Sequence, residues 1–366
     1  MTTDSRWTTA LTERFGIRYP IFAFSHSVDV VIEVSKAGGF GVFGGTRNTP
    51  AEIQAALQRI REAIGSHPFG IDLVIPKGMP AHNNREDIEA QIPSEHKTFV
   101  DHIYKKYDVP AATRPGMRTR FVRSEETAMQ QVRVVLESDV DLLALGVGSP
   151  PDVISLAKDR GKTVLSLVGQ PKHAVRAIDA GADILVAQGY DAGGHTGEIG
   201  TFSLVPQIVD IAQGRPVIAA GGVVSGRHVA AALAMGAQGV WTGTRWLLTR
   251  ENHTDPIILE KLIAAESADT IVSRSESGKT FRQIRSGWTD EWHAPGAPEP
   301  LKMPYHDILV GDLLGAIDEH KIKPLMHSGA GQGIGMLKSE TTVAEVMASL
   351  VQETEAALDA LTGGRR

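Results

Sequence analysis

A glycine-rich stretch in the middle of the chain holds a histidine suited to acid-base chemistry. It spans residues 188–198 and reads Gln-Gly-Tyr-Asp-Ala-Gly-Gly-His-Thr-Gly-Glu. Glycine lets the backbone turn sharply and approach a ligand closely, and histidine has an ordinary pKa near neutral pH, as proton abstraction requires. We therefore predict that His195 is a catalytic base. A purely structural histidine is the alternative.

Two further glycine-containing turns are typical of phosphate binding. Gly221-Gly222 and Gly243-Thr244 each follow a short apolar run. Backbone N–H groups in such turns can point at an anion, and Thr244 adds a hydroxyl donor. We predict a phosphate site here. Tight turns with no ligand are the alternative.

These residues need elements that bring them together, and the chain alternates short β-rich apolar runs with helical periodicity. The runs are residues 19–24, 41–44, 69–75, 142–146, 163–168, 184–188, 216–220 and 239–243. Eight such units predict an α/β fold, a (β/α)8 TIM barrel, whose active site lies at the carboxyl ends of its strands.

Helical stretches between the runs support this fold. Residues 50–64 carry apolar side chains at a three- and four-residue spacing that forms one stripe. Residues 172–180 and 226–235 are each followed by glycine, which favours a helix end. Near the end of the chain, Thr342 and Glu345 form a capping-box pattern that predicts a closing helix.

Two stretches do not fit the repeat. Residues 76–123 follow the third strand, and we expect an elaborated loop at the barrel mouth. Residues 250–325 follow the eighth strand, and we expect a small lid subdomain that carries Trp288 and Trp292 at the spacing of one helical face. The barrel would then comprise residues 1–249 and 326–366.

Composition excludes several classes of protein. The net charge is −6 without a basic cluster, which argues against nucleic acid as a partner. Cysteine is absent, so neither disulfides nor a catalytic thiol are available. No apolar run approaches the roughly 20 residues of a membrane span, and His96 and His102 lack a metal-binding pattern. We expect a cytoplasmic protein with no metal.

The glycine-rich motifs together resemble a known family. Residues 188–197, Leu204-Val205-Pro206, residues 216–222 and residues 239–244 are similar to nitronate monooxygenases, formerly called 2-nitropropane dioxygenases. The resemblance runs from about Arg14 to Gly331-Gln332-Gly333. FMN-dependent enoyl thioester reductases and NADH:quinone reductases share these motifs.

The resemblance implies an FMN cofactor, a small nitronate substrate, and O2 as the oxidant that yields a carbonyl compound and nitrite. His195 would remove the α-proton of a neutral nitroalkane. The residues that the resemblance places beside the flavin or its phosphate are Gln188, Gly193, Gly194, Gly221, Gly222, Trp241, Thr242, Gly243 and Thr244.

Two positions depart from the family pattern. Ala23, Phe24, Ser25 and His26 stand where the family has Ala-Pro-Met against the flavin ring, so we expect Ala23 and Phe24 to touch the flavin and His26, with Trp288, to face the substrate. Asp72 replaces an asparagine that reaches the flavin. A carboxylate there disfavours negative charge on the ring unless it is protonated or paired.

Other functions stay open at this level. An NAD(P)H-dependent FMN reductase of quinones or enoyl thioesters would use basic residues at the mouth, such as Arg282, Arg285 and Lys302. A flavin-free phosphate-binding barrel would be an isomerase or aldolase using Lys77 or His195. A flavin-binding protein without catalytic activity is the last alternative. Both a monomer and a homodimer are compatible with the sequence.

Overall fold

A computed structural model describes residues 5–76, 78–82 and 84–363, and its centre is a closed barrel of eight parallel strands. The barrel strands are, in order, β1 (Ile21–Ser25), β2 (Phe40–Gly44), β3 (Phe69–Val74), β4 (Leu142–Gly146), β5 (Thr163–Val168), β6 (Ile184–Gln188), β8 (Val217–Ala220) and β9 (Gly239–Thr242). Each predicted run overlaps one of these strands, although β1 and β2 each extend one residue beyond the predicted run. The predicted TIM barrel is confirmed.

Side chains alternate between the inside of the barrel and the surrounding helices. The inner cluster includes Phe22, Phe40, Leu142, Leu165 and Ile218, all without exposed surface. Their neighbours in sequence pack outward against helices, so these strands are apolar on both faces, as parallel strands usually are. The interior is therefore a packed core, and a ligand must bind at one end of it.

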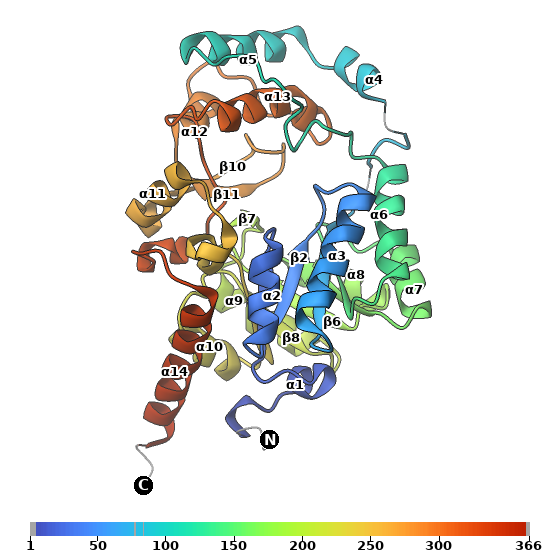
Figure 1. Cartoon of the computed structure of the whole chain (residues 1–366), viewed down its shortest axis with the longest axis vertical. Helices are drawn as coiled ribbons and strands as arrows, with labels where there is room; N and C mark the ends of the chain where they lie inside the picture. Colours follow the sequence, from blue (N-terminus) through green and yellow to red (C-terminus); the bar gives the residue numbers. More distant parts are fainter. Residues whose placement is uncertain (1–4, 77, 83, 364–366) are drawn as a thin grey trace.

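Helices cover the outside and the lower end of the barrel (Figure 1). They are α1 (Ala10–Phe15), α2 (Val28–Lys36), α3 (Pro50–Ile64), α6 (Glu125–Glu137), α7 (Pro151–Asp159), α8 (Pro171–Asp179), α9 (Thr201–Ile211), α10 (Gly226–Ala234) and α14 (Val343–Thr362). Helix α3 has the predicted bounds, and the predicted capping box of Thr342 and Glu345 begins α14. Leu11 of α1 joins the inner cluster, so α1 closes the end of the barrel opposite the lid.

The two stretches outside the repeat pack together above the mouth (Figure 1). Their elements are α4 (Arg85–Ala90), α5 (Ser94–Lys106), α11 (Pro256–Ala264), β10 (Thr270–Ser273), β11 (Phe281–Ile284), α12 (Gly287–His293) and α13 (Tyr305–Glu319). Ile103 of α5 shares a core with Trp288 of α12 and Leu313 of α13. The stretch after β3 is thus part of the layer over the mouth, because its apolar helix face is buried there.

A small antiparallel sheet joins this layer to the barrel. Its order is β10, β11, β7, and β7 is the two-residue strand Gly194–His195. His195 pairs with Phe281 of β11. Two residues are too short a segment for periodicity to predict a strand, so only the folded chain shows this connection.

None of the described helices combines the length and apolar character needed to cross a lipid bilayer. The barrel instead depends on close contact between strands and helices. At Gly41 of β2, a Cβ atom would lie 2.4 Å from the carbonyl oxygen of Val31 in α2.

We expect Gly41→Ala to lower the free energy of unfolding by more than about 2 kcal/mol, because the added methyl group must push α2 away from the sheet. Chemical denaturation measures this loss. The matched control is Gly200→Ala, whose Cβ would meet no atom within 4 Å. Equal denaturation midpoints for the two variants would contradict the packing described.

Candidate functional site

The residues expected to do chemistry meet at the barrel end that faces the lid. They follow β1, β3, β6, β8 and β9, whose carboxyl ends point the same way because the strands are parallel. Phe24 and Trp241 belong to the inner cluster near this end, and their rings stack with centroids 5.9 Å apart. They form an apolar floor beneath the mouth.

His195 is held on both sides by backbone contacts. Its Nδ1 lies 3.2 Å from the carbonyl oxygen of Thr280, and the Gln188 side-chain amide donates to the His195 carbonyl at 2.6 Å. A carbonyl oxygen only accepts, so Nδ1 carries the proton of this hydrogen bond and Nε2 has a free lone pair. The Phe281 ring meets the imidazole edge-on at 5.2 Å. This tautomer is the one a base needs.

The surroundings keep His195 neutral. Burial is the main cause that lowers the pKa of His195 to about 4; repulsion from Lys279 and Arg118 acts in the same direction, and the Thr280 carbonyl and Asp307 partly oppose it. A base must be unprotonated before it can accept a proton. His195 therefore has its basic form throughout the neutral pH range.

His26 has a similar arrangement after β1. Its Nδ1 lies 2.8 Å from the Gly44 carbonyl oxygen, and a Cβ atom at Gly44 would lie 2.6 Å from that nitrogen. Desolvation lowers the pKa of His26, with Arg47 and Arg118 adding repulsion, although the ring is solvent-accessible. Arg118 disfavours the protonated form of both His26 and His195.

Asp72 is a buried acid near the carboxyl end of β3. It is level with Gly44, the last residue of β2, and its side chain is 5% exposed. Oδ2 is fully buried, and no described residue donates a hydrogen bond to either oxygen. Burial raises the pKa of Asp72 to about 7, which Arg123 only partly opposes.

The turns after β8 and β9 present unused backbone donors. Gly221 and Gly222 have φ of +100° and +72°, a left-handed backbone that favours glycine. Within the described residues, no acceptor engages the amides of Gly221, Gly222, Gly243, Thr244 or Arg245. The Thr244 hydroxyl accepts from the Gly331 amide at 2.9 Å, and its proton is free to donate. Unused donors of this kind suit a phosphate group, and we call this set of groups the cradle.

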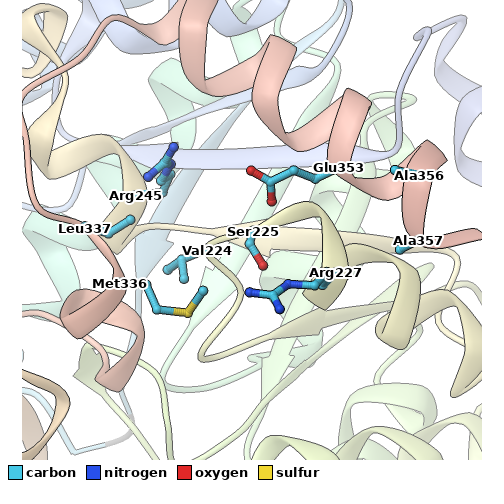
Figure 2. Close-up of a pocket in the computed structure, with 9 residues that line it drawn as sticks. All are labelled: Val224, Ser225, Arg227, Arg245, Met336, Leu337, Glu353, Ala356 and Ala357. Carbon is cyan, nitrogen blue, oxygen red and sulfur yellow. The ribbon is translucent and has the colours of Figure 1, made fainter.

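A cavity of about 540 Å³ adjoins the cradle (Figure 2). Figure 2 shows Glu353 of α14 and Arg227 of α10 extending into it from opposite sides. Arg245, next to Thr244, also lines it; its Nε is buried without a partner, and burial lowers its pKa. The Glu353 carboxylate accepts from the Gly226 amide at 2.9 Å.

Sequence reasoning missed these cavity residues. The position of Arg245 directly after the Gly243-Thr244 turn was a usable signal. No local signal indicated Glu353. It lies on the closing helix, about 110 residues further along the chain, and reaches the cradle only in the folded chain.

The C-terminal glycine motif is attached to the loop that carries His195. A Cβ atom at Gly193 would lie 2.7 Å from the Gly331 nitrogen, and the Gln332 amide donates to the Asp191 carbonyl at 2.9 Å. Gly194, with φ of +74°, continues this loop into β7. Only glycine at these positions lets the two backbones approach so closely.

Three expected contacts need correction. Trp288 has no exposed surface and lies in the lid core, stacked on His327 at 5.9 Å, so it is a packing residue and does not face the substrate. The Ala23 side chain packs outward with the helices. Thr242 donates to the Phe22 carbonyl and accepts from Trp246. Ala23 and Thr242 can therefore reach a ligand at the mouth only through their backbone atoms.

A charged cluster beneath the lid was also missed. Arg47 and Arg118 share one oxygen of Asp307 at 3.2 Å each, and Glu276 bonds Arg118 and, at 2.6 Å, His327. A cavity of about 210 Å³ lies among these groups. Four of them come from loops with no periodic pattern, which is why the sequence did not indicate the cluster.

Two remaining expectations concern lysine and metals. Lys77, the lysine expected for a flavin-free aldolase, lies outside the described residues. Within the described part of the chain, no three acidic or histidine side chains gather in a way that could hold a metal ion.

The chain is similar to known proteins along most of its length. The family model described as nitronate monooxygenase matches residues 8–353. A Mycobacterium tuberculosis protein named "Putative monooxygenase" is 40% identical over 362 residues, which cover 94% of this chain and 96% of that protein.

Two solved structures are similar along their whole length. The nitroalkane oxidase of Streptomyces ansochromogenes has a TM-score of 0.81 at 26% identity, covering 96% of this chain and all of that one. FabK of Thermotoga maritima has a TM-score of 0.74 at 25% identity, covering 97% and 99%.

The raised pKa of Asp72 predicts a stability that depends on pH. The folded chain keeps a proton that the unfolded chain loses near pH 4, so stability falls as the pH rises from about 4 to about 7. Asp72→Asn removes this loss. We expect Asp72→Asn to raise the free energy of unfolding at both pH values, by about 2–3 kcal/mol more at pH 8 than at pH 5.

Denaturation at the two pH values measures this difference. Asp290→Asn is the control, because Asp290 forms an exposed ion pair with Arg285 and should show a small effect at both pH values. An equal gain for Asp72→Asn at pH 5 and pH 8 would show that the Asp72 carboxyl is ionised in the folded protein.

Proposed function

The chain belongs to the nitronate monooxygenase family of flavin-dependent oxidoreductases, and on this premise we propose that it uses FMN and O2 to oxidise alkyl nitronates. The products would be a carbonyl compound and nitrite. The observation that carries the proposal is a neutral histidine with a free Nε2 at the barrel end that also holds an unused phosphate cradle.

The residues present fit FMN. The unpartnered amides of Gly222, Gly243 and Thr244 suit its phosphate, with Arg245 adding positive charge nearby. Phe24 and Trp241 offer an apolar surface for a flat ring. When bound, FMN supplies an electron acceptor that O2 can reoxidise.

His195 would act on the α-carbon of the substrate. With Nδ1 bonded to Thr280, its Nε2 can accept the α-proton of a neutral nitroalkane and leave the nitronate anion. A substrate that arrives as the nitronate has already lost this proton. Oxidation of a nitronate should therefore depend on His195 less than oxidation of a nitroalkane does.

Positive charge near His195 favours an anionic substrate. Lys279 directly precedes Thr280, is half-buried, and forms no ion pair with a described residue. Burial and repulsion from Arg123 lower its pKa. A nitronate oxygen beside Lys279 would supply the missing counter-charge.

The structure gives less support to an NAD(P)H-dependent reductase, because two of the basic residues expected to serve it, Arg282 and Arg285, already have partners. Arg282 is 2% exposed and donates to the Tyr190 carbonyl and the Thr270 hydroxyl. Arg285 is paired with Asp290 on the surface. Because the chain is also similar to FabK, the following experiment tests the reductase alternative too.

We expect the purified protein to be yellow and its flavin absorbance to bleach when ethylnitronate is added without oxygen. NADH and NADPH should leave the spectrum unchanged under the same conditions. Anaerobic absorbance spectroscopy distinguishes the candidates. Bleaching by NADH or NADPH alone would assign a reductase, and a colourless protein that takes up no FMN would support the flavin-free barrel.

We expect His195→Asn to lower kcat/KM for neutral nitroethane by about 10²- to 10⁴-fold, the usual contribution of a general base. The loss with ethylnitronate should be much smaller. In the wild type, kcat/KM for nitroethane should not decline between pH 8 and pH 6, because the basic form of His195 is lost only as the pH falls through about 4.

Steady-state oxygen consumption measures both effects. His67→Asn is the matched control, since residue 67 precedes β3 at the opposite end of the barrel. Equal losses with nitroethane and ethylnitronate would assign His195 a structural role. A decline centred near pH 6.5 would contradict the desolvated state of its ring.

A further inference from the structure

The Asp72 carboxyl is buried, and glycines of the neighbouring strands lie on either side of it. In register, Asp72 is level with Gly44 at the end of β2. On the other side, a Cβ atom at Gly146, the last residue of β4, would lie 3.4 Å from Oδ2. Because both strand ends are glycines, neither brings a side chain against the carboxyl.

No charged group forms a direct bond with this acid. The Arg123 guanidinium acts on Asp72 only at a distance, because it bonds the Val74 carbonyl and contacts the Met303 sulfur. Arg47 and Asp307 in turn act on Arg123. His26 is bonded to the Gly44 carbonyl beside Asp72, and its lowered pKa favours the neutral ring.

The buried Asp72 carboxyl has no hydrogen-bond partner among the described residues. Ionised, it would be a buried carboxylate without a donor, which is strongly unfavourable. Protonated, it has an O–H group for which the described residues offer no acceptor. A ligand bound at the mouth can supply this acceptor.

We propose that Asp72 binds the flavin as a neutral carboxylic acid, donating its O–H to an oxygen or nitrogen acceptor of the ring, and that loss of this proton weakens FMN binding. The inference rests on the proposed function, since it needs FMN at this end of the barrel. Asp72 is a flavin-binding residue here, not a base.

The direction of the pH effect follows from the charges. A carboxylate would face the lone pairs of a ring carbonyl or nitrogen and repel them, whereas the acid donates to them. If only the protonated form binds, the apparent Kd rises as the protonated fraction falls. With a pKa of about 7, Kd for FMN should rise about thirtyfold between pH 6 and pH 8.5.

The experiment titrates the full-length, flavin-stripped protein with FMN and follows the quenching of flavin fluorescence from pH 6 to pH 8.5. Riboflavin is titrated in parallel, because the FMN phosphate has its own ionisation near pH 6. The wild type should lose affinity for both flavins as the pH rises.

Two variants complete the test. Asp72→Asn keeps the shape and a donor but cannot ionise, so its Kd should be nearly independent of pH for riboflavin and at least tenfold below that of the wild type at pH 8.5. Asp318→Asn removes another acid with a raised pKa, one that lines the lid cavity, and should keep the wild-type pH dependence. Thermal unfolding verifies that both variants fold.

The outcomes separate the two proposals. Flavin binding by the wild type with a Kd for riboflavin that does not change with pH would overturn the inference and leave the proposed function standing. The same pH dependence in Asp72→Asn as in the wild type would also overturn it. Failure to bind FMN at any pH would overturn the proposed function and this inference with it.

Discussion

Closure of the parallel sheet is the constraint on which the other features depend. Each of the eight strands pairs with two neighbours, so no edge is left and all carboxyl ends form one ring. The inside is packed with apolar side chains such as Phe22 and Leu165, so chemistry is confined to that ring. Residues as distant in sequence as Asp72 and Thr244 therefore lie on, or just after, strands whose carboxyl ends share this ring.

Close backbone contacts then attach the later parts of the chain to the ring. Gly193 and Gly331 allow the loop after β6 and the C-terminal motif to lie against each other. The pairing of His195 with Phe281 extends a lid sheet down to the mouth. The lid thus provides the carbonyl of Thr280 that selects the tautomer of His195, and it is part of the site as well as its cover.

Desolvation governs the charges at the mouth. It lowers the pKa of His195 and His26 and raises that of Asp72, so each of these groups favours its neutral form. The pKa of Arg118 falls to about 10, which still leaves it protonated. Arg118 is paired with Asp307 and Glu276, so the histidines at the mouth stay neutral beside an ion-paired cation. A substrate that becomes anionic when it gives up a proton relieves the repulsion that the newly charged histidine would otherwise meet.

The barrel, the order and approximate bounds of its strands, and the glycine turns of the cradle could all be predicted from the sequence. These features are local: continuous apolar runs, helical spacing and glycine positions are set by neighbouring residues. The tertiary structure alone decided that Trp288 is buried, that Ala23 points outward, and that Arg118 and Glu353 border the mouth and the cradle. It also decided the protonation of Asp72, because desolvation depends on atoms contributed by distant segments, which no local pattern contains.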